Sequence, residues 1–490
     1  MNPSYTIEDV DIKTLYRMML EHLRAGFRLV QIGATGREDG TELIYSVAKD
    51  YQMDNFRVFV ESGEIINSIS DIFPSAALFE NEIAELFGVD IDCINLDFHG
   101  KFYRIDKETP FCKAPMGENV TIVKKRREMQ RMANRTIVPF GPQHPVLPEP
   151  IHLDLVLEDE KVVEAIPSIG FVHRGLEELA GRRDFHDYQY VVERICGICS
   201  FKHGMAYCET LEQIFGAEVP PRAKYLRTIW GEMSRIHSHL LWLGLLADAF
   251  GFDALFMQCW RMREKVLDMF EASTGGRVIF SVNTIGGVLK DMDSDMLKSF
   301  VAIFDDMEKE LHSLAHVFLN DYSVQSRLRG VGVLTKEQAL LYGAVGPMAR
   351  ASGIEIDTRK LGYEAYGDAE FDIITSTDCD GYARCRVRIG ELFQSIGIIR
   401  QLAAKVPDSQ LTVPIKGMPK GEAIVRVEQP RGEAFYYTKA NGTKFLERFR
   451  VRTPTFTNLY ALLHILPGSE LADVPLQILT IDPCISCTER

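Results

Sequence analysis

The sequence predicts an α+β protein in which helices dominate. Four long segments in the C-terminal part of the chain carry apolar residues at helical spacing, which is typical of helices that bury one face. The N-terminal part combines helical patterns with short runs of strand character. At 490 residues the chain is too long for one ordinary hydrophobic core, so we expect at least two domains.

The N-terminal part is expected to form a small α+β domain. Apolar residues recur at helical spacing from Ile12 to Leu23, strand-like pieces follow at 28–32 and 55–60, and a second helix is predicted over 76–87. None of these residues has the chemistry of a catalytic site. We therefore predict that this domain serves to dock against another protein.

A change of composition marks the boundary between the two domains. The segment from Lys124 to Arg135 is basic and polar, unlike the sequence on either side of it. We therefore divide the chain into a docking domain over 1–120, a linker over 121–136 and a large domain over 137–490.

The large domain is predicted to be built on a helical bundle with small sheets at its ends. The expected helices are Pro221–Phe250, Ala254–Ala272, Met292–Leu319 and Val387–Ala404, and the expected strands are 151–157, 423–427 and 433–437. Cofactor sites in bundles lie between facing helices. Two histidines of the first helix, His237 and His239, are expected to be structural or interfacial.

Composition excludes several classes of protein. A net charge of −14 argues against nucleic-acid binding, whose electrostatic footprint is basic. No apolar run is long enough for a membrane span, and the first residues lack the basic and apolar pattern of a signal peptide. Six of the ten cysteines are scattered without a disulfide-like pattern. We expect a cytoplasmic chain whose membrane attachment comes through partner subunits.

Two cysteine pairs dominate the large domain: Cys196-Gly-Ile-Cys199 and Cys484-Ile-Ser-Cys487. Four thiolates form a soft donor set that suits zinc, nickel or iron. In zinc ribbons the two pairs lie about 15–20 residues apart, whereas positions 199 and 484 are 285 residues apart. The spacing argues against a small structural zinc module.

With their flanks, Arg194–His203 and Asp482–Arg490, the two pairs resemble the nickel-binding signatures of NiFe-hydrogenase large subunits. The resemblance implies that the four cysteines hold nickel, with Cys196 and Cys484 as terminal ligands. It implies that Cys199 and Cys487 also bridge to an iron that carries CO and two cyanide ligands. His203 is then the histidine that hydrogen-bonds a bridging sulfur.

The large domain also resembles the D subunit of respiratory complex I. The segments that carry this resemblance are Gly141–Pro145, Gly170–Gly175, Arg235–Gly244, Gly346–Gly353 and Gln429–Glu433. It raises a competing hypothesis, a quinone-site or electron-transfer subunit without metal. The D-subunit pattern lacks the paired cysteines, and its quinone-contacting histidine falls at Pro148, whose ring has no donor. The group 4 hydrogenases, which are related to complex I, fit both observations; a zinc-stapled scaffold is a third alternative.

The segment Phe79–Gly88 resembles the signature of the complex I C subunit, with Glu80, Glu82 and Glu85 in its acidic positions. A C-like domain fused to a hydrogenase-like one implies the formate hydrogenlyase type. The expected reaction interconverts two protons and two electrons with H2, in the direction of H2 evolution.

The resemblance assigns five further residues. Glu149 matches the glutamate that conducts protons from the metal site, and Arg431 matches the arginine over the open metal position. Asp482 could orient that arginine. Pro454 and Thr455 match the residues that surround and hydrogen-bond a cyanide. The alternatives to Glu149 are Glu177, Glu178 and Glu193.

The same resemblance implies several partners. The sequence contains no iron–sulfur motif, so electrons must leave through a small hydrogenase subunit that carries such clusters, and a ferredoxin-like subunit and integral membrane subunits complete the complex. Hydrogenase precursors of this type carry a tail that a maturation protease removes after His or Arg. A chain that ends at Arg490 matches a processed product and equally a product made without a tail.

Overall fold

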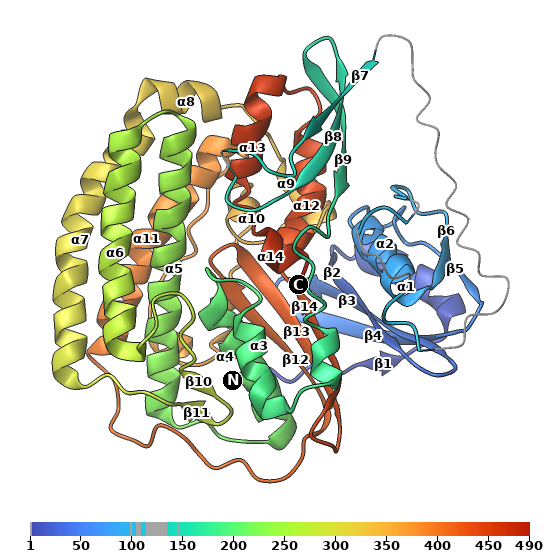
Figure 1. Ribbon diagram of the computed structural model, residues 1–490, viewed down its shortest axis with the longest axis horizontal. Helices are drawn as coiled ribbons and strands as arrows, with labels where there is room; N and C mark the ends of the chain where they lie inside the picture. The colour runs from blue at the N-terminus through green and yellow to red at the C-terminus, as the bar shows by residue number, and fades with distance from the viewer. Residues whose placement is uncertain (1, 99, 104–108, 114–134, 146) are drawn as a thin grey trace.

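The computed structural model describes residues 2–98, 100–103, 109–113, 135–145 and 147–490. It has an α+β fold in which helices dominate, as the sequence predicts (Figure 1). The predicted linker over 121–136 falls almost entirely outside the described residues. Within the described residues, no helix is long and apolar enough to cross a membrane.

The N-terminal domain is a four-stranded sheet in the order β1-β4-β3-β2. Its elements are β1 (Glu8–Asp9), α1 (Ile12–Arg24), β2 (Arg28–Gly36), β3 (Gly40–Lys49), β4 (Gln52–Glu61), β5 (Ile65–Asn67), α2 (Ala76–Phe87) and β6 (Asp90–Asp92). Both helices and the strands at β2 and β4 were predicted. Strand β3 was missed because nine of its ten residues are buried, so its sequence does not alternate between apolar and polar residues.

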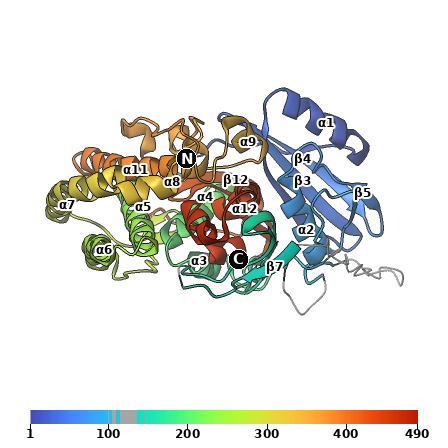
Figure 2. The same cartoon turned by 90° about the horizontal axis from the view of Figure 1, so that it is seen from above.

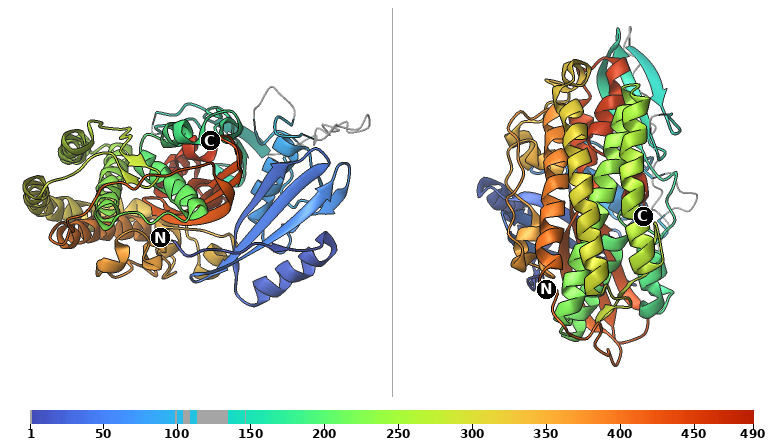
Figure 3. Two further views of the ribbon diagram at one scale, coloured as in Figure 1. Left: turned by 90° about the horizontal axis from the view of Figure 1, so that it is seen from below. Right: turned by 90° about the vertical axis from the view of Figure 1, so that its left-hand side faces the viewer.

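The four long predicted helices form the bundle: α5 (Pro221–Ala249), α6 (Asp253–Thr274), α7 (Ser294–Asn320) and α11 (Gly381–Ala403). They lie side by side in Figure 3. Helix α11 begins six residues before its predicted start because Asp380 caps it, accepting a hydrogen bond from the backbone N–H of Ala383.

Three small sheets and several short helices complete the large domain. The sheets are β7-β8-β9 (Arg135–Phe140, His152–Glu158, Lys161–Ser168), β10-β11 (Asn283–Thr284, Gly287–Val288) and β12-β13-β14 (Lys420–Gln429, Gly432–Asn441, Leu446–Arg452). The remaining helices are α3 (Phe185–Glu193), α4 (Ser200–Phe215), α8 (Tyr322–Leu328), α9 (Lys336–Leu341), α10 (Pro347–Arg350), α12 (Pro454–Ile465), α13 (Val474–Thr480) and α14 (Ile485–Thr488), with short 3-10 turns at Glu178–Gly181, Thr358–Leu361, Tyr366–Asp368 and Leu471–Asp473.

The β12-β13-β14 sheet lies between the bundle and the N-terminal domain (Figures 1 and 2). Its edge strand β14 faces β2, the edge strand of the N-terminal sheet. Three arginines at alternate positions of β14 donate to three backbone carbonyls at alternate positions of β2. The pairs are Arg448 with Ala34 (2.7 Å), Arg450 with Ile32 (3.4 Å) and Arg452 with Val30 (3.0 Å). The arginines thus supply donors to the open edge of the N-terminal sheet.

The two domains share a hydrophobic core as well. Phe79 of α2 packs against Phe456 of α12, with ring centroids 5.0 Å apart, and Phe102 lies against the same ring. The N-terminal domain is therefore packed tightly onto the large domain. Its predicted docking role stays a prediction.

Candidate metal centre

Three of the four cysteines lie in turns that precede a helix, and Cys487 lies within the short helix α14. Cys196 and Cys199 come directly before α4, and Cys484 comes directly before α14. The backbone N–H groups of Ile198 and Cys199 point at the Cys196 sulfur, at 3.3 and 3.4 Å. Donors of this kind favour a thiolate at that position.

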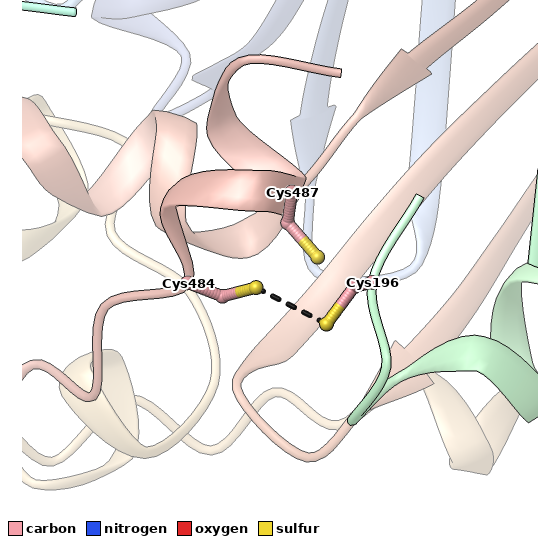
Figure 4. A group of neighbouring side chains, drawn as sticks. All are labelled: Cys196, Cys484 and Cys487. Carbon is pink, nitrogen blue, oxygen red and sulfur yellow. Dashed lines mark hydrogen bonds between the residues drawn. The ribbon is translucent and has the colours of Figure 1, made fainter. Parts of the chain in front are cut away.

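Three of the sulfurs converge although their pairs are far apart in the chain. The Sγ atoms of Cys196, Cys484 and Cys487 all lie within 4.8 Å of one another, and the Cys484 thiol donates to the Cys196 sulfur at 3.2 Å (Figure 4). Cys199 is buried beside them, and its backbone N–H donates to the Cys196 sulfur at 3.4 Å. All four side chains are at most 3% exposed.

This donor set fits nickel and iron. Hydrogen bonds from Cys199, Cys484 and Cys487 hold the pKa of the Cys196 thiol well below its ordinary value. The pKa values of the other three thiols are raised. The hydrogen bond to Cys196 is the main cause for Cys484, and burial is the main cause for Cys487. Without a cation, four buried thiolates would repel one another, and soft divalent metals are the cations that thiolates prefer.

His203 of α4 lies beside the cysteines, as the resemblance implied. Its Nε2 is 3.3 Å from the Cys487 sulfur, and its Nδ1 is 2.8 Å from the Tyr436 hydroxyl. Burial lowers the pKa of His203 to about 4, so the ring is neutral near pH 7. In the tautomer with the proton on Nε2, the ring donates to the sulfur and accepts from Tyr436.

Arg431 lies in the turn between β12 and β13, and its side chain contacts Cys199. Its Nη1 lies 3.5 Å from the Cys199 sulfur and 3.4 Å from the Ser238 hydroxyl. Asp482 fixes the guanidinium: its Oδ1 is 2.7 Å from Nη2, and its backbone carbonyl accepts from Nε at 2.8 Å. A bidentate contact of this kind holds a planar guanidinium in one orientation.

Residues at the start of α12 hydrogen-bond the backbone of the second cysteine pair. The Thr455 hydroxyl accepts from the backbone N–H of Cys484 at 3.1 Å, and Pro454 is the first residue of the helix. The neighbouring Thr453 hydroxyl donates to the Cys487 carbonyl at 3.0 Å. The role predicted for Pro454 and Thr455, contact with a cyanide, stays a prediction.

Glu149 lies beside the turn that carries Cys484 and begins α14. Its carboxylate accepts from the backbone N–H of Ile485, from the backbone N–H of Ser486 at 3.1 Å and from the Ser486 hydroxyl at 2.5 Å. It thereby caps α14, whose first residue follows Cys484. The side chain is half-buried, so it lies between the cysteine site and the outside of the domain.

The three alternatives to Glu149 have other surroundings. Glu177 is surrounded by the guanidiniums of Arg448, Arg450 and Arg490, and Glu178 pairs with Arg182 in a more exposed position. Glu193 accepts from the N–H and the hydroxyl of Ser281, and burial raises its pKa to about 7. Glu193 therefore has a proton affinity suited to exchange near neutral pH.

Three residues at the site were not predicted. Tyr436 and Gln429 orient His203, and Thr453 holds Cys487. Gln429 is the first residue of the segment Gln429–Glu433, so the sequence pattern could have identified it as a site residue. No pattern marks Tyr436, whose position follows from the pairing of β12 with β13. The predicted structural histidines His237 and His239 are buried and contact Arg263 and Glu391.

Three family models match the chain. The model for the respiratory-chain NADH dehydrogenase 30 kDa subunit covers residues 5–94, and that for nickel-dependent hydrogenases covers 174–248. The model for the 49 kDa subunit of the same dehydrogenase covers 249–416 and 411–490. The first cysteine pair thus falls in the hydrogenase match and the second in the 49 kDa match.

Similar proteins include hydrogenases and a chain of a respiratory membrane complex. The carbon monoxide-induced hydrogenase of Rhodospirillum rubrum is 40% identical, over 72% of this chain and 99% of that protein. Formate hydrogenlyase subunit 5 of Escherichia coli is 36% identical, over 72% of this chain and 63% of its own length. Among solved structures, a chain of the membrane-bound sulfane sulfur reductase, an archaeal respiratory membrane complex, matches with a TM-score of 0.70 and 31% identity. That match covers 73% of this chain and 99% of the other.

Proposed function

This chain belongs to the group 4 hydrogenase large subunits, which are related to the 49 kDa subunit of respiratory-chain NADH dehydrogenase, and we propose that it is the catalytic subunit of a NiFe-hydrogenase complex. The proposed reaction interconverts two protons and two electrons with H2. The similar proteins include hydrogenases and a reductase of sulfane sulfur, so the reaction itself is part of the proposal.

One observation carries the proposal: two CxxC pairs, 285 residues apart in sequence, bring the sulfurs of Cys196, Cys484 and Cys487 within 4.8 Å of one another, with Cys199 buried beside them. A quinone-site subunit does not require paired cysteines. Cys196, Cys199, Cys484 and Cys487 would hold nickel, with Cys199 and Cys487 shared with an iron that carries CO and two cyanides. When bound, this centre supplies a Lewis acid that polarises H2 and a redox-active site that takes up its electrons.

The residues around the sulfurs supply the remaining functions. Glu149 can take a proton from the site and pass it outward, because it is half-buried and touches the turn that bears Cys484. Arg431, fixed by Asp482, places a permanent positive charge beside Cys199. His203 donates to Cys487 and tunes the basicity of that sulfur. Burial of all four cysteines excludes water from the site.

We assign the chain to the formate hydrogenlyase type, working in the direction of H2 evolution. Support comes from the fused 30 kDa-like domain and from the similarity to formate hydrogenlyase subunit 5. The proposed partners are a small subunit with iron–sulfur clusters, a ferredoxin-like subunit, integral membrane subunits and a maturation protease. The complex would sit on the cytoplasmic face of the membrane through those partners.

Metal analysis of the purified chain tests the proposal against its alternatives. We expect nickel and iron in near-equal amounts. A quinone-site subunit would contain neither metal, and a stapled scaffold would contain zinc; either of those results would contradict the proposal.

Replacement of one bridging cysteine tests the ligand set. In Cys487→Ser we expect hydrogen turnover to be abolished while the fold is kept, because a hydroxyl loses its proton far less readily than a thiol and is a poor ligand for soft metals. The matched control is Cys385→Ser, which alters a buried cysteine of α11. Turnover at the control's level in Cys487→Ser would remove this cysteine from the site.

A further inference from the structure

We propose that Glu82 of the N-terminal domain, together with Glu177, is a receptor for the Arg490 side chain that holds segment 484–490 closed around the cysteine site. Glu82 is then a positioning residue for Cys484 and Cys487, although it touches neither. The inference rests on the proposed function for the role of those cysteines, but its test needs no bound metal.

The Arg490 side chain is buried, 3% exposed, and each part of its guanidinium has a partner. Its Nη2 donates to Glu82 at 2.5 Å, its Nε donates to Glu177 at 2.7 Å, and its Nη1 donates to the Thr488 carbonyl at 2.7 Å. The guanidinium also lies over the ring of Phe456, 5.1 Å from its centroid. These contacts define one position for the side chain and orient the residues before it.

Glu82 comes from helix α2 and is itself fully engaged. Its Oε2 accepts from Arg450 at 2.5 Å, and its Oε1 accepts from the Tyr103 hydroxyl at 2.9 Å in addition to Arg490. The carboxylate is 2% exposed, so water does not compete with these donors. Glu82 thus connects the N-terminal domain to segment 484–490.

The charge balance makes Glu82 indispensable to this arrangement. Three guanidiniums, of Arg448, Arg450 and Arg490, meet there with two carboxylates, of Glu82 and Glu177. Removal of the Glu82 charge leaves one buried carboxylate for three buried cations. Since unpaired buried charges are strongly unfavourable, Arg490 is expected to leave the pocket.

The contact matters for the cysteines because α14, which contains Cys487 and follows Cys484, is a helix of only four residues that ends just before Glu489 and Arg490. A single turn does not persist without tertiary contacts. Glu149 holds its first residues, and the Thr453 hydroxyl holds the Cys487 carbonyl. Beyond the helix, the backbone of Val172 donates to the Glu489 carboxylate at 2.6 Å, and Arg490 fixes the end. Release of Arg490 therefore frees the outer end of the turn that carries Cys487.

Thiol accessibility in the metal-free full-length chain tests the proposal. The chain is treated with N-ethylmaleimide after removal of metal by a chelator, and the labelling rates of Cys484 and Cys487 are read by peptide mass spectrometry. We expect Glu82→Gln to raise both rates at least 10-fold. Arg490→Gln should raise them by a similar factor, and the double variant no further, since both changes break one contact.

Two controls separate this result from general unfolding. Glu80→Gln changes another buried glutamate of α2, which contacts Ser68 and not the large domain, and it should label at the wild-type rate. Cys385 serves as an internal reference, because it is buried in α11 and should stay protected in every variant. Wild-type rates in both Glu82→Gln and Arg490→Gln, or equal gains at Cys385, would overturn the proposal. A chain that binds no nickel would contradict the proposed function and leave this result standing.

Discussion

Glu149 differs from an ordinary helix-capping residue because the helix it caps starts at the metal-site turn. It binds two backbone N–H groups of that turn and is half-buried. These contacts leave a titratable group between the sulfurs and the outside of the domain. Glu177 and Glu178 lack such a position.

Glu149→Gln should separate proton transfer from assembly of the site. The amide keeps the shape and some hydrogen bonds but cannot exchange a proton, so nickel and iron should stay bound while H2 evolution falls about 100-fold. Exchange between D2 and water should fall in parallel. Glu178→Gln, which changes a partly exposed glutamate that pairs with Arg182, is the matched control. Near-normal turnover and exchange in Glu149→Gln would move the proton route to Glu193.

Glu80 predicts a dependence of stability on pH. Burial raises its pKa from 4.5 to about 7. Because the folded-state pKa is the higher one, the stability that protonated Glu80 contributes is complete below pH 4.5 and is lost as the pH rises through about 7. The stability of wild type relative to Glu80→Gln should therefore fall between pH 4.5 and pH 8, by up to about 3 kcal/mol. Thermal denaturation across that range measures it, and a constant difference would contradict it.

At the scale of elements, helix α5 packs into the bundle through buried charge as well as apolar surface. Glu232 is fully buried and accepts from Arg235 at 3.3 Å, from Arg359 at 3.1 Å, from Tyr366 at 2.5 Å and from Ser395 at 2.6 Å. It thus connects α5 to α11 and to the turn at Thr358–Leu361. The apolar periodicity that predicted α5 gave no sign of this network, because its members are far apart in sequence.

Loss of Glu232 should destabilise the bundle strongly. Glu232→Ala leaves Arg235 and Arg359 without their shared carboxylate, so we expect a loss of about 3–5 kcal/mol. Glu310→Ala, which removes a partly exposed partner of Arg261 and Lys265, should cost less than about 1 kcal/mol. Denaturant unfolding of both variants measures the difference. Equal losses would mean that the buried network contributes no more than a surface ion pair.

Periodicity predicted α6 and α7 because each buries one stripe against its neighbours, whereas α5 is apolar enough to be predicted although it is buried on all sides from Leu226 to Gly244. Periodicity failed for β3, which is buried on both faces, and it placed the start of α11 late, since the first turn is stabilised by a cap and not by an apolar stripe. At the site, the two cysteine pairs and their flanks predicted one metal centre. Tyr436 and Thr453 carried no signal, because backbone pairing and helix position bring them there.

At the scale of the whole molecule, the N-terminal domain is joined to the large domain by charged residues that the sequence did not connect. Glu80 and Glu82 of its acidic stretch are buried, and Glu82 contacts Arg450 and Arg490 of the large domain. A pair that joins positions 82 and 490 leaves no trace in local sequence. The same holds for the three arginines of β14 that bind the edge of β2.

Infrared spectroscopy of the native complex tests the central claim most directly. An iron that carries CO and two cyanides has stretching bands that no other group in such a protein produces. We predict one CO band and two cyanide bands in the wild-type protein, absent from Cys487→Ser and retained in Glu149→Gln. A metal-loaded, folded chain without these bands would contradict the assignment of a NiFe centre.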